Sequence, residues 1–218
     1  IDLDLKEDTW LRGVEIKPGN SKVVHHIVLT NTETNKQSLI TSRKPLPWTD
    51  NYIALGGGTD QLTLFPEGTG VFLQKGTVLT IQIHYTPIGK EVIDQTRLGF
   101  YYHETPPISE FYALSPSNID FTIPPFAKNI KLTAVDSIEK DIHIHYVVPH
   151  MHYRGKSIKF NVQFPNDSIK TIVSIPDFNF NWQWLYKLKD PIPIPKGSKI
   201  IVEGIYDNTY QNPLNPDP

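Results

Sequence analysis

The sequence contains no cysteine among its 218 residues, and it contains one methionine. Without cysteine the chain can form neither disulfides nor cysteine–zinc sites, and it cannot use a thiol as a nucleophile. Lysine and arginine number 21 against 23 aspartates and glutamates, so the formal net charge is -2. With no basic excess, nucleic acid is not expected as a partner.

Long apolar runs are also absent, because no run approaches the roughly 18 residues of a transmembrane helix. We therefore expect no membrane span. The chain begins at Ile1 rather than at a methionine and ends in NPLNPDP. We expect both ends to result from processing or shortening, with any export signal already removed. This fits our expectation of an extracytoplasmic protein, either periplasmic or secreted.

Proline and glycine are frequent, with 19 and 13 copies. They separate short runs rich in Val, Ile, Thr, Tyr and Phe, which is typical of strands joined by turns. No window has a sustained apolar repeat at helical spacing. We predict strands over residues 22–30, 77–85, 97–103, 157–164 and 199–206. The sequence thus predicts an all-β fold of two tandem jelly-roll-like antiparallel β-sandwich domains.

A stretch rich in proline and serine, residues 104–118, reads as a linker between the halves of the chain. We place one domain at residues 1–105 and the other at residues 117–218. Residues 73–86 resemble residues 194–207, since each has Lys-Gly, a hydroxyl residue and then a strand with a tyrosine near its end. Two similar sandwiches that face each other across a solvent cleft are the architecture we expect.

The amino-terminal half has a histidine pair, His25 and His26, inside the apolar run VVHHIVL. A buried imidazole without a partner costs about 1–3 kcal/mol, so these rings either donate hydrogen bonds to backbone carbonyls or bind a metal. Neighbouring strand residues point to opposite faces. One shared ion would require a kinked strand or the use of different ring nitrogens. Alternation places His84, in TIQIHYT, on the more polar face of its strand.

The carboxy-terminal half has His150 and His152 in PHMH. If the strand continues through Pro149, both rings lie on its inner, apolar face, close enough to reach one ion. Structural packing is the alternative. Met151 has the opposite parity, so we expect it to fill a gap in the core or to lie on the outer face. His143 and His145 are expected to face solvent; these are the remaining two histidines of that segment.

Three segments in this order, VVHHIVL, IQIHYTPIGK and PHMHYRGK, resemble the copper type II ascorbate-dependent monooxygenases. This family includes peptidylglycine α-hydroxylating monooxygenase and dopamine β-monooxygenase. HMH-x-RGK and NP-x-NPDP are similar to its bacterial branch, and the resemblance covers nearly the whole chain. It implies two copper ions, one per domain. The implied ligands are His25, His26 and His84 for an electron-transfer copper, and His150 and His152 for an oxygen-activating copper.

The resemblance also implies an activity: hydroxylation of a C–H bond with O2 and electrons from ascorbate or another donor. The substrate would be a small molecule or a peptide. In the family, a methionine beyond the NPDP segment completes the second site, whereas Met151 is the one methionine here. Peptide-amidating members have an arginine where this sequence has Val148. The resemblance therefore gives no support for peptidylglycine as the substrate.

Other functions and other roles stay open at this point. The alternatives are a non-catalytic copper-binding or electron-transfer protein, a structural or adhesion sandwich, and a zinc hydrolase, although no glutamate is spaced as in HExxH. Arg154 and Lys156 are expected in a charged turn or strand edge, or as groups that attract an anion or position an outer-shell partner. Residues 179–188 predict a core strand whose Trp182, Trp184 and Tyr186 share one face, or a wall of a substrate cleft.

Overall fold

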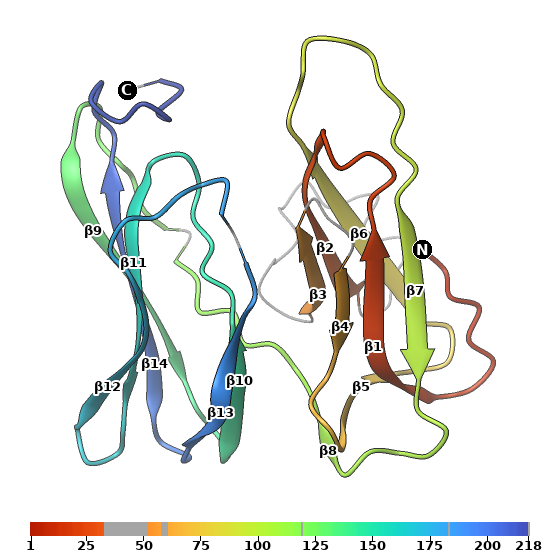
Figure 1. Cartoon of the computed structure of the whole chain (residues 1–218). Helices are drawn as coiled ribbons and strands as arrows, with labels where there is room; N and C mark the ends of the chain where they lie inside the picture. Colours follow the sequence, from red (N-terminus) through yellow and green to blue (C-terminus); the bar gives the residue numbers. More distant parts are fainter. Residues whose placement is uncertain (33–51, 58–60, 119, 183, 218) are drawn as a thin grey trace. The chain divides into compact units, whose positions relative to one another are not determined.

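The computed structural model of the chain describes residues 1–32, 52–57, 61–118, 120–182 and 184–217. These residues form strands and no helix, so the predicted all-β class is confirmed. No membrane-spanning helix is found among them. The chain folds into two compact units, Ile1–Ser115 and Pro116–Pro218, which are labelled by strand in Figure 1.

The first unit has two sheets. One contains β1 (Thr9–Lys17), β4 (Gln61–Leu64), β5 (Thr69–Leu73), β7 (Arg97–Tyr102) and β8 (Ser109–Glu110); the other has the order β3 (Tyr52–Gly57), β2 (Val24–Thr32), β6 (Val78–Tyr85). Leu11 and Val14 of β1 and Ile27 and Leu29 of β2 are fully buried in one cluster. Because these strands belong to different sheets, the core lies between the two layers.

The central strand β2 pairs antiparallel with β6, for example Ile27 with Ile83 and Leu29 with Ile81. Isoleucine and leucine fill these positions because branched side chains pack well on a pleated surface. Ile81 and Ile83 pack against the buried cluster. The alternation of β6 therefore directs its odd-numbered residues to the core and leaves even-numbered His84 on the other face.

The first unit continues into the region expected to be a linker. Strand β8 pairs parallel with β5. Just beyond it, the Phe111 ring stacks on Phe65 with ring centroids 4.8 Å apart. The Phe111 amide donates to the Gly70 carbonyl at 2.7 Å. These contacts tie the start of the predicted linker to the first unit, which extends to Ser115.

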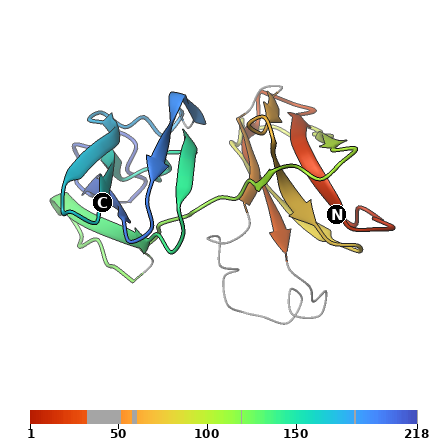
Figure 2. The same cartoon turned by 90° about the horizontal axis from the view of Figure 1, so that it is seen from below.

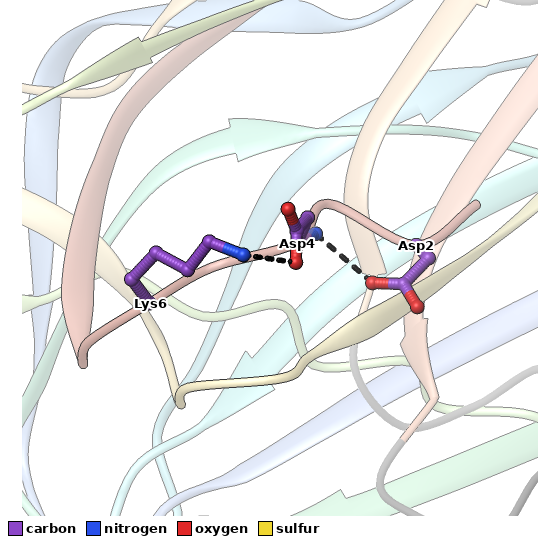
Figure 3. A network of polar contacts seen from close by, with 3 residues as sticks. All are labelled: Asp2, Asp4 and Lys6. Carbon is purple, nitrogen blue, oxygen red and sulfur yellow. Dashed lines mark hydrogen bonds and ion pairs between the residues drawn. The ribbon is translucent and has the colours of Figure 1, made fainter.

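The amino-terminal segment lies along β6. The Ile1 ammonium donates to the Leu79 carbonyl, and the Leu79 amide donates to the Ile1 carbonyl at 2.8 Å. Further along, Lys6 Nζ bonds Asp4 Oδ1 at 2.7 Å, and the Asp4 amide bonds Asp2 Oδ1 at 2.9 Å (Figure 3). The Lys6 and Asp4 side chains are 79% and 81% exposed, so this pair contributes little to stability.

The second unit also has two sheets. One pairs β10 (Ile142–Val147) with β13 (Tyr186–Ile194); the other has the order β12 (Ile169–Ile175), β11 (Gly155–Gln163), β14 (Lys199–Asp207), β9 (Lys128–Ser137). Figure 2 shows the β10–β13 pair opposite the four-stranded sheet. Buried Ile194 of β13, Val162 of β11 and Ile200 of β14 form one cluster between them. This arrangement is a β-sandwich core.

Five strands predicted from sequence are present as β2, β6, β7, β11 and β14. The predicted strand over residues 179–188 is wrong for most of its length, because β13 begins only at Tyr186. Asn179 accepts hydrogen bonds from the Asn181 and Trp182 amides, which turns the chain. Trp182 and Trp184 consequently stand 59% and 47% exposed rather than in the core.

Candidate metal centres

Two paired strands, β2 and β6, bring together the three histidines predicted for the first site. His26 lies directly opposite His84 in the strand register. Their ring centroids are 4.1 Å apart, with 31° between the ring planes. Residues opposite each other on one sheet face are the closest side-chain neighbours in a sheet. Residues far apart in sequence thus contribute adjacent imidazoles.

A β-bulge brings His25 to the same place. Val24 pairs with Tyr85 and His26 pairs with His84, so two steps along β2 match one step along β6. His25 is the extra residue. A bulge bends its strand and re-aims a side chain that regular alternation would send to the opposite face. His25 Nδ1 consequently lies 2.8 Å from His26 Nδ1. This is the strand kink that a shared ion requires.

The donor set of this first site suits a copper or zinc ion, since it offers three imidazoles and no carboxylate. Among the described residues, no group of three or more His, Asp or Glu side chains is already arranged as a metal cage. Nitrogens that share one tetrahedral ion at about 2.0 Å each lie about 3.3 Å apart. The 2.8 Å pair is therefore a hydrogen bond between rings. The two rings would have to move apart to share an ion.

The carboxylate of Asp94 braces the chain on both sides of this first site. Asp94 Oδ2 accepts from the Tyr85 and Thr96 hydroxyls, each at 2.9 Å, and Oδ1 accepts from the Asn20 amide at 2.9 Å. Tyr85 follows His84, and the turn at Asn20 leads into β2. Partial burial acts to raise the pKa of Asp94, but these hydrogen bonds outweigh it and lower that pKa. The sequence did not indicate this role, because the Asn20 amide that Asp94 accepts from lies 74 positions earlier in the chain.

The second site lies in the loop between β10 and β11, which we call the HMH loop (residues 148–154). The ring centroids of His150 and His152 are 5.0 Å apart and their planes are nearly perpendicular, at 89°. The prediction that both rings lie on the inner face of a continuing strand is wrong. Strand β10 ends at Val147, and both histidines are exposed.

Pro149 and Met151, which directly precede His150 and His152, explain why the rings face outward. Pro149 is fully buried and has no amide hydrogen to donate, so it ends the ladder. Met151 is 3% exposed and packs with Ile158 and Phe178, so of the two places expected for it, the core and the outer face, it takes the core. Inward-facing Pro149 and Met151 thus alternate with outward-facing His150 and His152.

Two glycines make room for Met151. A Cβ added at Gly155 would lie 2.7 Å from Met151 Cβ and 3.0 Å from its sulfur, and one at Gly204 would lie 3.2 Å from its terminal methyl. Neither a 2.7 Å nor a 3.0 Å separation is compatible with normal packing. The methionine is therefore closely fitted into the sandwich, away from the exposed imidazoles beside it.

The other described histidines belong to neither set. His103 Nε2 bonds the Thr69 carbonyl at 2.9 Å. On β10, His143 is exposed, as predicted, whereas His145 is half-buried. Burial lowers the pKa of His145, and positive charge at His143 and Lys187 lowers it further.

Comparison with known protein families gives one match that covers the HMH loop. Residues 113–214 match the family described as copper type II ascorbate-dependent monooxygenase, C-terminal domain. The match includes His150, His152 and nearly all of the second unit. The assignment to a bacterial branch stays a prediction.

Proposed function

The chain belongs to the copper type II ascorbate-dependent monooxygenase family through its second unit, and we propose that it is a copper-dependent monooxygenase with two copper sites. In balanced form, the substrate C–H bond and O2, with two electrons and two protons, give C–OH and water. Ascorbate or another external donor supplies the electrons. The substrate would be a small molecule or a peptide.

The observation that carries this proposal is the exposed imidazole pair of the HMH loop, inside the family match. His150 and His152 would hold the oxygen-activating copper; both rings are exposed and 5.0 Å apart at their centroids. Exposed ligands leave coordination positions open to O2 and substrate, as catalytic metal sites require. When bound, copper would supply the one-electron redox chemistry that activation of O2 needs.

The first histidine set suits the electron-transfer role. His26 is buried, and His25 and His84 are half-buried, so they would hold an ion inside the sheet. Three imidazoles leave less room for exogenous ligands than two. A shielded ion with few open positions favours passage of electrons over binding of substrate.

Copper stoichiometry and oxygen uptake test this function together. We expect the full chain to bind two copper ions, with one lost in His25→Ala and the other lost in His150→Ala. With ascorbate and substrate present, wild type should consume O2 and each variant should fail to hydroxylate. Wild type that binds one ion or none, or that forms no hydroxylated product from a panel of candidate substrates, contradicts the proposal.

One observation favours a second candidate, a non-catalytic copper-binding or electron-transfer protein. Met151 is packed in the core, so the described part of the second site offers two imidazoles and no thioether. Soft sulfur ligands favour Cu(I), and a site without one holds the reduced ion less well. Copper that is reduced by ascorbate without substrate-dependent O2 consumption would identify this second function.

A further inference from the structure

The HMH loop is anchored over its first half by burial. Pro149 and Met151, which directly precede His150 and His152, are buried in the core. This leaves the second half of the loop, Tyr153 and Arg154, in a turn where Tyr153 is exposed and Arg154 is half-buried. The Tyr153 ring lies against Phe180, with ring centroids 4.1 Å apart. Backbone and guanidinium contacts supply the remaining support of this half.

Those contacts go to the end of β14 and to the tail (residues 208–217). Arg154 Nε donates to Asn208 Oδ1 at 2.6 Å, and Arg154 Nη2 donates to the Asp217 carbonyl at 2.5 Å. The Arg154 carbonyl accepts from the Asp207 amide at 2.8 Å. The Tyr153 carbonyl accepts from Asn212 Nδ2 at 3.1 Å. Four hydrogen bonds therefore connect two consecutive loop residues to one segment.

The tail is itself fixed to the second unit at Asn208, which is 5% exposed. Its backbone amide donates to the Ala127 carbonyl at 2.8 Å, and its side-chain amide donates to the Pro124 carbonyl at 2.9 Å. Asn215 Nδ2 donates to the same Asn208 Oδ1 at 2.9 Å. Since this buried oxygen accepts from both Arg154 and Asn215, its position is set by the fold rather than by solvent.

The partners of the Arg154 side chain indicate a geometric role for the guanidinium and not a purely electrostatic one. Both side-chain acceptors of Arg154 are neutral amide oxygens, on Asn208 and on the Asp217 backbone. A guanidinium presents donors in a rigid planar fork, so it reaches two acceptors in fixed directions. A lysine ammonium is a single point donor and cannot replace that geometry.

From these contacts we propose that Arg154 is a positioning residue for the second copper site, and that the tail is the strap against which it holds the HMH loop. Arg154 lies two residues after His152, and its side chain bonds the tail, so it would act on the site through the loop. Its two side-chain bonds fix the turn that follows the ligands, which limits the orientations available to the His152 ring. The inference rests on the proposed copper site at His150 and His152.

A test needs a copper signal from the second site alone. The full chain with His25→Ala and His26→Ala provides this background, because the first set then lacks two of its three imidazoles. Into it we would introduce Arg154→Met, Arg154→Lys and, as a charge-matched control, Lys156→Met. Lys156 Nζ bonds Asn129 at 2.7 Å and makes no contact with the tail among the bonds described above. Cu(II) affinity by competition titration and the EPR spectrum are measured, with melting curves to verify folding.

We expect the background protein to bind one Cu(II) ion. Supporting residues around metal ligands typically change affinity by about 10–100-fold, so Arg154→Met should weaken binding at least about 10-fold and broaden the EPR signal. Arg154→Lys should fail to restore either property, whereas Lys156→Met should leave both unchanged. If Arg154→Met does not fold, Asn215→Ala offers a milder removal of the same support and should also weaken copper binding.

The possible results distinguish failure of the positioning role of Arg154 from failure of the proposed copper site. Folded Arg154→Met and Asn215→Ala variants with unchanged affinity and spectrum overturn the positioning role. Full rescue by lysine, or an equal loss in Lys156→Met, also overturns it, since charge alone would then explain the effect. If the background protein binds no copper, or binds it equally after His150→Ala and His152→Ala are added, the proposed copper site fails instead.

Discussion

The Nδ1 atoms of His25 and His26 lie 2.8 Å apart, although the two residues are consecutive on a β-strand. Regular alternation would place their side chains on opposite faces of the sheet. The bulge at His25 removes that separation, and His84 on the neighbouring strand completes the group. The strand irregularity is thus what allows this apolar segment to present more than one imidazole to a single ion.

Copper should therefore stabilise the folded chain through this group. A ligand at about 100 times its Kd, bound only to the native state, adds about 2.7 kcal/mol per site. We expect copper to raise the melting temperature of wild type and to raise that of His26→Ala less. Calorimetry with and without copper measures the difference.

The control for this experiment is His103→Ala. This histidine bonds the Thr69 carbonyl and lies outside both histidine sets, so its loss should lower the melting temperature without changing the rise caused by copper. An unchanged copper-dependent rise in His26→Ala would show that the group on β2 and β6 does not bind the metal.

Strands β2, β6, β7, β11 and β14 were predictable because runs rich in Val, Ile and Tyr between prolines and glycines leave few other conformations. The bulge was not, because it depends on the pairing of residues 24–26 with residues 84–85, almost 60 positions away. From the sequence alone one could say only that an ion shared by His25 and His26 requires a kinked strand or the use of different ring nitrogens. At His150 and His152, alternation gave the wrong face because Pro149 ends the strand that the rule assumes.

Gly155 should tolerate no larger residue. In Gly155→Ala the new Cβ would lie 2.7 Å from Met151 Cβ and 3.1 Å from the His152 carbonyl oxygen. Overpacking of this kind typically costs about 1–3 kcal/mol. Chemical denaturation should show that loss of stability, together with weaker copper binding at the HMH loop. Gly99→Ala is the matched control, because the new methyl would mainly meet the flexible side chain of Glu15. Equal stability losses in both variants would contradict the argument.

Met151 should act as an anchor and not as a copper ligand. Met151→Leu conserves volume in the core, so we expect it to cost less than about 1.5 kcal/mol and to leave copper affinity at His150 and His152 unchanged. Met151→Ala leaves a cavity and should cost about 2–5 kcal/mol. Denaturation and copper titration of the two variants measure both effects. A Met151→Leu protein that folds normally but loses Cu(I) affinity would identify the thioether as a ligand.

Asp94 should make the first unit sensitive to acid. Its folded-state pKa is lowered, so its ionised form stabilises the native state at pH values above the ordinary aspartate pKa of about 3.9. That contribution is lost as pH falls through the lower folded pKa. In Asp94→Asn an NH2 group replaces one acceptor oxygen, so donors from Tyr85, Thr96 or Asn20 lose partners. The stability difference between wild type and Asp94→Asn should be largest near neutral pH and shrink below about pH 4.

Asp4→Asn is the control, at the exposed ion pair of Figure 3. Its stability should differ little from that of wild type at any pH, because exposed pairs contribute little. Denaturation midpoints of wild type and the two variants between pH 3 and pH 7 measure these differences. If the stability difference between wild type and Asp94→Asn stays constant over that range, the charge of the Asp94 carboxylate does not stabilise the fold.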